Sequence, residues 1–312
     1  MENKKPNENL LAIRDLVVEY TSDKQVVHAV NSVSLDIARG ETLGLVGETG
    51  AGKTSIARSI LRILPDPPAK VMGGEIWFDG EDNLSLPEKK MRTIRGNKIS
   101  MIFQDPMTSL NPVFTVGSQL KEAIELHTSR KGKEAEARAI EMLTLVGVNE
   151  PEKRIKQYPY ELSGGMRQRV MIAMALSCEP DILIADEPTT ALDVTIQAQI
   201  LELMQDLQKQ LGMAIIMVTH DLGVIADMCD EIIVMYGGRV CERGTAEDIF
   251  YRPSHEYTKG LLRSIPNVGR MGEKLVPIPG TPINLLNMPK GCAFCPRCEN
   301  AMKICLTEQP PE

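Results

Sequence analysis

The chain has 312 residues, of which 43% are hydrophobic, and this length is sufficient for a large buried core with an additional subdomain. The formal net charge of −7 leaves no broad basic field, which argues against a nucleic-acid-binding protein. Residues 1–9 are polar and predict no signal peptide, and no apolar run reaches the length of about 18 residues that spans a bilayer.

The first predicted elements surround a glycine-rich loop. Residues 10–20 form an amphipathic run, and residues 42–46 are a short apolar run that predicts a buried strand. Residues 47–54 read Gly-Glu-Thr-Gly-Ala-Gly-Lys-Thr, a complete P-loop pattern G-x-x-x-x-G-K-S/T. Residues 53–64 have helix-like content that ends at Pro65. Strand, loop and helix in this order are the context that a P-loop requires.

The loop residues suit a bound nucleoside triphosphate. Gly47, Gly50 and Gly52 allow backbone N–H groups to turn inward around phosphate oxygens, and the helix N-terminus adds its partial positive charge. Lys53 is expected to reach the β- and γ-phosphates, and the Thr54 hydroxyl is expected to ligate magnesium. The sequence therefore predicts a site for ATP and Mg²⁺ at this loop.

The middle of the chain changes from strands to helices. Residues 74–80 predict a strand that runs into a turn. From about residue 105 to 165 the pattern becomes helical, with apolar residues three and four apart in residues 116–127 and 133–146. Gly147 predicts the end of the second of these helices.

A capped helix and a buried strand follow. Ser163 is a good N-cap, and Gly164 and Gly165 open a helix that is expected to continue to about Cys178. Such a helix start attracts anions, and a capped helix without a ligand is the alternative. Residues 181–185 are nearly all apolar, which predicts a central parallel strand.

Two carboxylates, Asp186 and Glu187, follow this strand. They lie where open α/β sheets bind ligands, and neighbouring residues of an extended segment point to opposite sides. Asp186 is therefore expected on the magnesium side, and Glu187 is expected to orient or deprotonate the attacking water. A solvated acidic strand end is the alternative, and the preceding P-loop argues against it. A long helix is then predicted over residues 193–211, with strands over 214–218 and 231–236.

The order of these motifs resembles that of ABC ATPases over about residues 10–265. Residues 162–169, Leu-Ser-Gly-Gly-Met-Arg-Gln-Arg, are similar to the signature motif of the family and precede the acidic strand at the family's distance. The resemblance implies an α/β P-loop NTPase core with an antiparallel β subdomain and a helical subdomain. It also implies two nucleotide-binding domains packed head to tail, so that Ser163, Gly164 and Gly165 face the γ-phosphate held by the other domain's P-loop.

Other positions match the same family one by one. Gln104 resembles the glutamine that touches magnesium and water and couples to the membrane partner, and Asp193 resembles the aspartate at the dimer seam. His220 resembles the switch histidine that contacts the γ-phosphate, and Tyr20 the aromatic residue that stacks on adenine; ordinary packing is the alternative for both. The catalytic residues that the resemblance implies are Glu187, His220, Lys53 and Gln104. The implied nucleotide-binding residues are Tyr20, Gly47, Glu48, Thr49, Gly50, Ala51, Gly52, Lys53, Thr54, Ser55, Ser163, Gly164, Gly165 and Asp193, and the implied magnesium ligands are Thr54, Gln104 and Asp186.

Past about Gly244 the chain departs from the common ATPase pattern. Residues 252–266 predict a helix with Ser254 as its cap and Pro266 as its stop, and a stiff linker follows over residues 277–282. This passage resembles the C-terminal extension of ATPases that serve oligopeptide, dipeptide and nickel importers. The expected domains are an ABC nucleotide-binding domain over residues 1–245, with its helical subdomain over about 105–165, and a C-terminal extension over 246–312 with a Cys-rich metal-binding segment over 291–305.

Four of the seven cysteines lie close together in this extension. The spacing C-x2-C-x2-C-x6-C is formed by Cys292, Cys295, Cys298 and Cys305. In a cytosolic chain this clustering favours metal or redox chemistry over disulfides. We expect a [4Fe–4S] cluster that staples a tail too polar to bury its own core, with zinc or metal-free reactive thiols as alternatives. Cys178, Cys229 and Cys241 are expected to be small core residues.

The function that the resemblance implies is that of the ATP-hydrolysing subunit of an importer for peptides or nickel. The expected partners are two membrane permease subunits, a second ABC ATPase (a paralogue or a second copy) and, indirectly, an extracytoplasmic solute-binding protein. The expected location is the cytoplasmic face of the membrane. The expected cofactors are ATP, Mg²⁺ and a [4Fe–4S] cluster. One alternative is a soluble ABC ATPase that acts on nucleic acid or ribosomes, which the acidic charge disfavours. Another is a regulatory module that uses ATP only as a structural ligand, which intact Glu187 and His220 disfavour.

Overall fold

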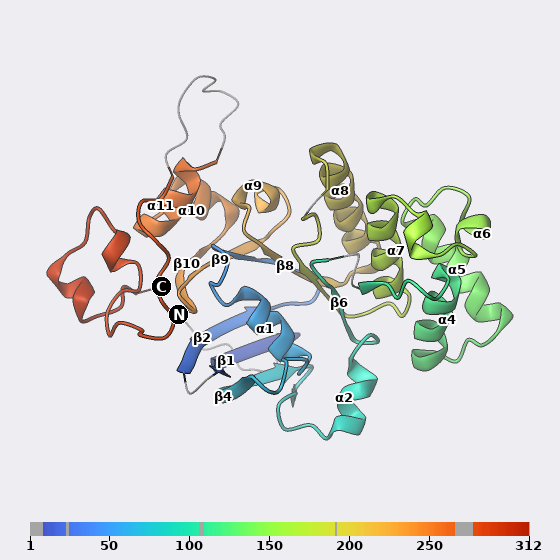
Figure 1. Cartoon of the computed structure of the whole chain (residues 1–312), viewed down its shortest axis with the longest axis horizontal. Coiled ribbons are helices and arrows are strands. Elements are labelled where there is room, and N and C mark those ends of the chain that lie inside the picture. Colours follow the sequence, from blue (N-terminus) through green and yellow to red (C-terminus); the bar gives the residue numbers. More distant parts are fainter. Residues whose placement is uncertain (1–8, 23–24, 106–108, 191, 266–276, 312) are drawn as a thin grey trace. The chain divides into compact units, whose positions relative to one another are not determined.

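The computed structural model describes residues 9–22, 25–105, 109–190, 192–265 and 277–311 (Figure 1). The chain divides into two compact units, one formed by Met1–Leu86 and Met217–Glu312 and the other by Pro87–Ile216. The polypeptide leaves the first unit after Leu86 and returns to it within strand β8 (Ala214–Thr219). The N-terminal strands and the C-terminal extension therefore belong to the same unit.

An antiparallel sheet in the first unit confirms the expected antiparallel β subdomain. Its strands lie in the order β2-β1-β4-β5. Tyr20 of β1 lies opposite Val27 of β2 on one side and Ala69 of β4 on the other. The strands are β1 (Leu11–Ser22), β2 (Gln25–Ile37), β4 (Ala69–Phe78) and β5 (Glu81–Asp82), so that β4 begins five residues before the predicted start at residue 74.

A second group of strands in the first unit supports the glycine-rich loop. Strand β9 (Glu231–Tyr236) pairs in parallel with β3 (Thr42–Val46) and antiparallel with β10 (Arg239–Gly244). Every residue of β3 is buried, as the apolar run predicts. Helix α1 (Lys53–Ile60) follows the loop and ends earlier than predicted, because Arg62 has left-handed backbone (φ 53°) and cannot continue a helix.

Short helices complete the first unit. They are α9 (Leu222–Ile225), α10 (Ala246–Tyr251), α11 (Glu256–Arg263) and the 3₁₀ turns η3 (Cys295–Arg297) and η4 (Lys303–Leu306). The predicted cap of α11 was wrong by one residue, since His255 Nδ1 accepts the Tyr257 N–H at 3.1 Å. The Ser254 N–H instead donates to the Glu242 carboxylate at 2.5 Å. The predicted stop of this helix, Pro266, lies outside the described residues.

The second unit joins helices to a parallel pair of strands. Strands β6 (Ile99–Ile102) and β7 (Ile182–Asp186) pair in parallel, and the helices gather beside them (Figure 1). The two helices predicted from apolar spacing are α4 and α5, and they bury Leu120, Ile124 and Met142. The helices are α2 (Glu88–Ile94), α4 (Val116–His127), α5 (Lys133–Leu145), α6 (Pro151–Arg154), η1 (Pro159–Glu161), α7 (Gly164–Leu176) and α8 (Val194–Leu211). Within the part of the chain that the structure describes, no helix combines the length and the apolar content needed to cross a membrane.

Candidate functional site

The glycine-rich loop of residues 47–54, here called the phosphate loop, has a backbone that only glycine permits at two points. Gly47 has φ 154°, and a Cβ there would lie 2.1 Å from the Met235 carbonyl oxygen. Gly52 has φ 99°, and a Cβ there would lie 2.3 Å from the Ala29 carbonyl oxygen. Both contacts are with backbone, which cannot move aside as a flexible side chain would. The close approach of β9 and β2 to the loop therefore requires glycine, and it shapes the loop as a cradle for an anion.

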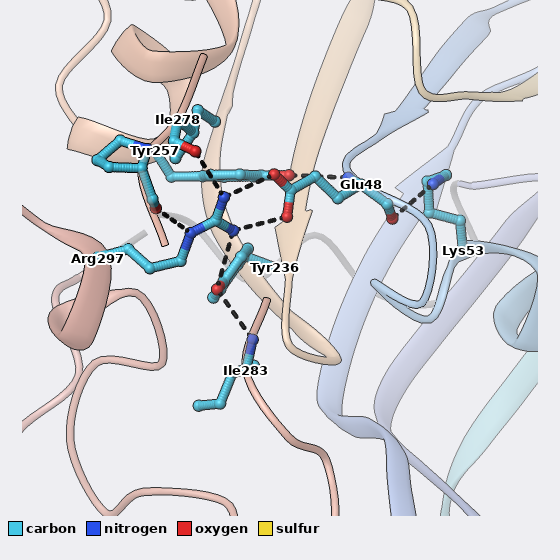
Figure 2. Close-up of polar contacts among 8 residues, drawn as sticks. Glu48, Lys53, Tyr236, Tyr257, Ile278, Ile283 and Arg297 are labelled. Carbon is cyan, nitrogen blue, oxygen red and sulfur yellow. Dashed lines mark hydrogen bonds and ion pairs between the residues drawn. The ribbon is translucent and has the colours of Figure 1, made fainter. Parts of the chain in front are cut away.

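Lys53 lies beneath this cradle with its ammonium group against the loop backbone. Its side chain is buried, and Nζ donates to the Gly47 carbonyl oxygen at 2.6 Å. Nζ also donates to the Glu48 carbonyl oxygen at 3.1 Å (Figure 2). The two carbonyl oxygens hold the ammonium group against the backbone of the loop. The first turn of α1 follows directly, so its open backbone N–H groups and the Thr54 hydroxyl belong to the same anion-binding element.

Tyr20 lies beside the start of α1. Its hydroxyl is 3.1 Å from the Ser55 hydroxyl, one residue beyond the phosphate loop. The structure therefore brings Tyr20 to the predicted nucleotide-binding residues, while its stacking on adenine stays a prediction. His220 follows β8 directly and is exposed. These residues, with the phosphate loop, are the predicted site residues of the first unit.

The second unit holds the predicted carboxylates. Asp186 ends the fully buried strand β7 and is only 2% exposed, whereas Glu187 is half-buried, so the two carboxylates differ in burial. The expected extended backbone was wrong at Glu187, which has φ 47°, because the segment turns at this residue. Left-handed backbone is uncommon for a residue with a side chain and occurs often at functional sites.

Hydrogen bonds from Gln104 and Thr190 hold the Glu187 carboxylate. Glu187 Oε2 accepts from Gln104 Nε2 at 2.7 Å and from the Thr190 hydroxyl at 3.0 Å. The structure thus brings together two predicted catalytic residues that are 83 positions apart in sequence. Sequence reasoning missed Thr190; its place three residues after Glu187, where the chain turns, was the available signal. We call Gln104, Asp186, Glu187 and Thr190 the carboxylate site.

The predicted signature residues form an open helix start on the second unit. The Ser163 hydroxyl accepts the Met166 N–H at 3.4 Å and caps α7 as predicted. Ser163 and Gly164 are exposed, and Gly165 is half-buried. Asp193 is exposed at the N-cap of α8. An exposed, capped helix start with glycines in its first turn is open to an anion.

The Cys-rich segment (residues 291–305) brings its cysteines near one another. The Cys292 N–H donates to the Cys305 carbonyl at 2.8 Å, and Cys292 Sγ lies 3.8 Å from His255 Nε2. Cys292, Cys298 and Cys305 line one cavity of about 490 Å³ with His255. Burial raises the pKa of the Cys292 thiol, and the backbone N–H groups around it only partly offset this.

The [4Fe–4S] and zinc predictions find no support in this arrangement. A metal centre needs at least three ligand atoms about 2.0–2.3 Å from one point. Among the described residues, no group of three or more His, Cys, Asp or Glu side chains is placed to hold a metal ion. The metal at this segment therefore remains a sequence-based prediction.

The other three cysteines divide into two kinds. Cys229 is buried as predicted, and burial raises the pKa of its thiol to about 12. Cys178 and Cys241 are half-buried, and Cys241 lines the cavity of the Cys-rich segment.

Two known families match two separate segments of the chain. Residues 30–190 match the family described as ABC transporter, and residues 241–305 match the family described as oligopeptide/dipeptide transporter, C-terminal region. The chain therefore belongs to the ABC transporter family, within its oligopeptide/dipeptide branch, and it is an ATPase.

Curated relatives and solved structures agree with this assignment. The dipeptide transport ATP-binding protein DppD of Bacillus subtilis is 53% identical over 96% of this chain and 89% of that protein. The oligopeptide transport ATP-binding protein OppD of Salmonella typhimurium is 50% identical over 98% of this chain and 91% of that protein. A dimeric ATP-binding cassette solved in a post-hydrolysis state with ADP and Pi is 28% identical with a TM-score of 0.68, over 76% of this chain and 98% of that one.

Proposed function

We propose that this chain supplies the energy for peptide import by hydrolysing ATP for separate membrane permease subunits. The observation that carries the proposal is the match of residues 241–305 to the C-terminal region of oligopeptide/dipeptide transporters. The names of the relatives, which are dipeptide and oligopeptide transport ATP-binding proteins, support peptides over nickel and over a nucleic-acid or ribosome substrate.

The residues of the phosphate loop bind the nucleotide in this proposal. Loop N–H groups and the helix start receive phosphate oxygens, and Lys53 offsets their charge. Magnesium, when bound, would supply charge neutralisation at the phosphates, and Thr54, Gln104 and Asp186 carry the oxygen atoms that suit this hard cation. Tyr20 supports the adenine from β1.

The carboxylate site positions the attacking water in this proposal. Glu187 accepts hydrogen bonds from Gln104 and Thr190, so its carboxylate has a fixed orientation before water arrives. From this position it orients or deprotonates the water for in-line attack, while His220 contacts the γ-phosphate.

The working unit in this proposal is a pair of ATPase subunits. Ser163, Gly164, Gly165 and Asp193 are exposed and are available to a second subunit, whose phosphate loop they complete. The relative solved as a dimer with ADP and Pi supports this arrangement. The second subunit is a paralogue or a second copy.

The domain division follows from the same proposal. Residues 1–245 are the nucleotide-binding domain, with a helical subdomain over about 105–165, and residues 246–312 are the C-terminal extension. The helical part carries exposed apolar side chains, with Val113 at 70% and Phe114 at 54% exposure. An apolar hollow of about 230 Å³ in the same unit is lined by Leu110, Met171 and Met174, among other residues. Such a surface suits a permease at the cytoplasmic face of the membrane, and an extracytoplasmic solute-binding protein acts indirectly through that permease.

Reconstitution tests this function directly. The chain is co-expressed with the permease and ATPase subunits encoded beside it, and the purified complex is placed in liposomes with labelled dipeptide, oligopeptide or Ni²⁺. ATP-dependent uptake of a peptide, lost in Lys53→Ala, is the expected result. Failure to associate with any permease, or co-purification with ribosomes or DNA instead, contradicts the proposal.

A further inference from the structure

The C-terminal extension reaches the phosphate loop through a paired arginine and glutamate within the first unit. Arg297 Nη1 donates to Glu48 Oε2 at 2.8 Å, and Arg297 Nη2 donates to Glu48 Oε1 at 3.1 Å (Figure 2). Two parallel hydrogen bonds between a guanidinium and a carboxylate form a strong and directional pair. Glu48 is the second residue of the phosphate loop, and Arg297 lies in η3 between two cysteines of the Cys-rich segment.

Arg297 is built into its position and is not a surface side chain that happens to meet Glu48. Its side chain is 5% exposed, and Glu48 is 26% exposed. Its remaining donors bind the carbonyls of Pro279 at 2.9 Å and Ile278 at 3.4 Å and the Tyr236 hydroxyl at 3.3 Å. Its guanidinium also lies 5.7 Å from the ring centre of Tyr236 and 5.8 Å from that of Phe294.

The charge of Arg297 is maintained in spite of this burial. Burial by itself disfavours the charged form, but the hydrogen bonds to Glu48 and Tyr236 outweigh it and raise the pKa of Arg297 above its usual value. A buried charge with all of these partners is costly to leave unpaired. The pair is therefore a fixed link between the extension and the loop.

The backbone of Glu48 is held as well as its side chain. Its N–H donates to the Tyr257 hydroxyl at 2.8 Å, and its carbonyl accepts from Lys53 Nζ at 3.1 Å. Tyr257 belongs to α11 and is fully buried against Tyr236 and Phe294, with ring centres 4.7 and 5.3 Å away. Residues beyond position 245 thus hold both the side chain and the backbone N–H of Glu48. Its carbonyl accepts from the Ala51 N–H at 3.1 Å and from Lys53, which the proposed function assigns to phosphate binding.

We propose that Arg297 is a positioning residue of the ATPase, which holds the phosphate loop in its nucleotide-binding form through Glu48. The Cys-rich segment is then a brace whose folding sets the affinity for ATP. The inference rests on the proposed function, in which the phosphate loop binds ATP. By thermodynamic reciprocity, ATP binding also stabilises the segment around Arg297.

The test compares three variants of the full-length chain in complex with its partner subunits. Arg297→Met removes the charge and the two parallel hydrogen bonds to Glu48. Arg297→Lys keeps the charge but cannot form these two parallel hydrogen bonds. Arg263→Met is the matched control, because Arg263 forms an exposed pair with Glu299 of the same extension at 4.0 Å. We measure the Kd for Mg·ATP by titration, the KM and kcat of ATP hydrolysis, and the melting temperature without nucleotide.

The expected result is that the affinity for ATP depends on the two parallel hydrogen bonds between Arg297 and Glu48. Arg297→Met raises Kd and KM for ATP about 10-fold with little change in kcat, which is the loss expected for a charge-assisted hydrogen-bonded pair. Arg297→Lys recovers part of this, and Arg263→Met binds ATP as the wild type does. A folded Arg297→Met protein with the wild-type Kd overturns the inference. If the wild-type and Arg263→Met proteins also fail to bind ATP, the proposed function is what fails.

A second measurement keeps the inference falsifiable if Arg297→Met does not fold. Cys295, at the start of η3, is alkylated with a maleimide in the wild-type complex, and its modification rate is followed by mass spectrometry with and without Mg·ATP. Slower modification at saturating Mg·ATP is expected, and Glu48→Gln, which keeps the size of the side chain but weakens the pair, should reduce this protection. An equal rate with and without nucleotide overturns the proposed link.

Discussion

The phosphate loop is shaped by contacts of the backbone, whereas the carboxylate site is shaped by hydrogen bonds between side chains. The phosphate loop is formed by backbone, because Gly47 and Gly52 lie against carbonyl oxygens and Lys53 is held by two further carbonyls. The carboxylate site is formed by side chains, because Gln104 and Thr190 orient Glu187. A substitution in the first region should therefore act on folding and affinity, and one in the second should act on turnover.

The largest effect is expected at the lysine of the phosphate loop. Lys53→Ala removes the buried ammonium, and ATP binding should weaken about 100-fold or more, because the phosphates lose a charge-assisted partner at the loop. Titration with Mg·ATP measures this, and Lys133→Ala, at an exposed lysine of α5, is the control. Near-normal affinity in Lys53→Ala would remove the lysine from the nucleotide site.

Glu187→Gln should separate affinity from turnover. The amide keeps the size of the side chain but cannot take a proton, so kcat should fall about 100-fold or more while ATP binding is preserved. Gel filtration with Mg·ATP should then show a trapped pair of ATPase subunits. Hydrolysis at the wild-type rate would show that Glu187 is not the base.

Gly52→Ala tests the backbone origin of the phosphate loop. The new Cβ meets the Ala29 carbonyl at 2.3 Å in left-handed backbone, so the free energy of unfolding should fall by about 3 kcal/mol. Gly50→Ala is the matched control, because Gly50 also has positive φ (84°) but a Cβ there meets nothing within 4 Å. Its expected loss is about 1 kcal/mol. Urea unfolding without nucleotide measures both, and equal losses would contradict the role of the close contact.

The smallest effect is expected at Thr190. Thr190→Val removes a hydrogen bond that orients Glu187, so kcat should fall about 5-fold with KM for ATP unchanged. Thr190→Ser keeps the hydroxyl and should retain the wild-type kcat. A larger effect on KM than on kcat would place Thr190 with the nucleotide-binding residues.

Local patterns in the sequence were sufficient for the motifs and for many of the elements, and the resemblance that the motifs carry implied the class of fold. The G-x-x-x-x-G-K-T run predicted strand β3, the loop and helix α1, and the apolar run before Asp186 predicted β7, because these structures depend on residues that are neighbours in sequence. Elements such as β2, β6 and α2 were not predicted, and the other errors lay at element ends. Helix α1 stops where Arg62 takes positive φ, and His255 rather than Ser254 caps α11.

Only the tertiary structure decided which side chains meet across long separations in the chain. Arg297 is 249 residues from Glu48, and Gln104 is 83 residues from Glu187, so no period or spacing in the sequence connects them. The spacing of the cysteines also did not predict their arrangement in space. It predicted a metal cluster, whereas the described residues give no set of ligands for one. Backbone geometry is encoded locally, whereas the pairing of buried charges depends on which strands and turns pack together.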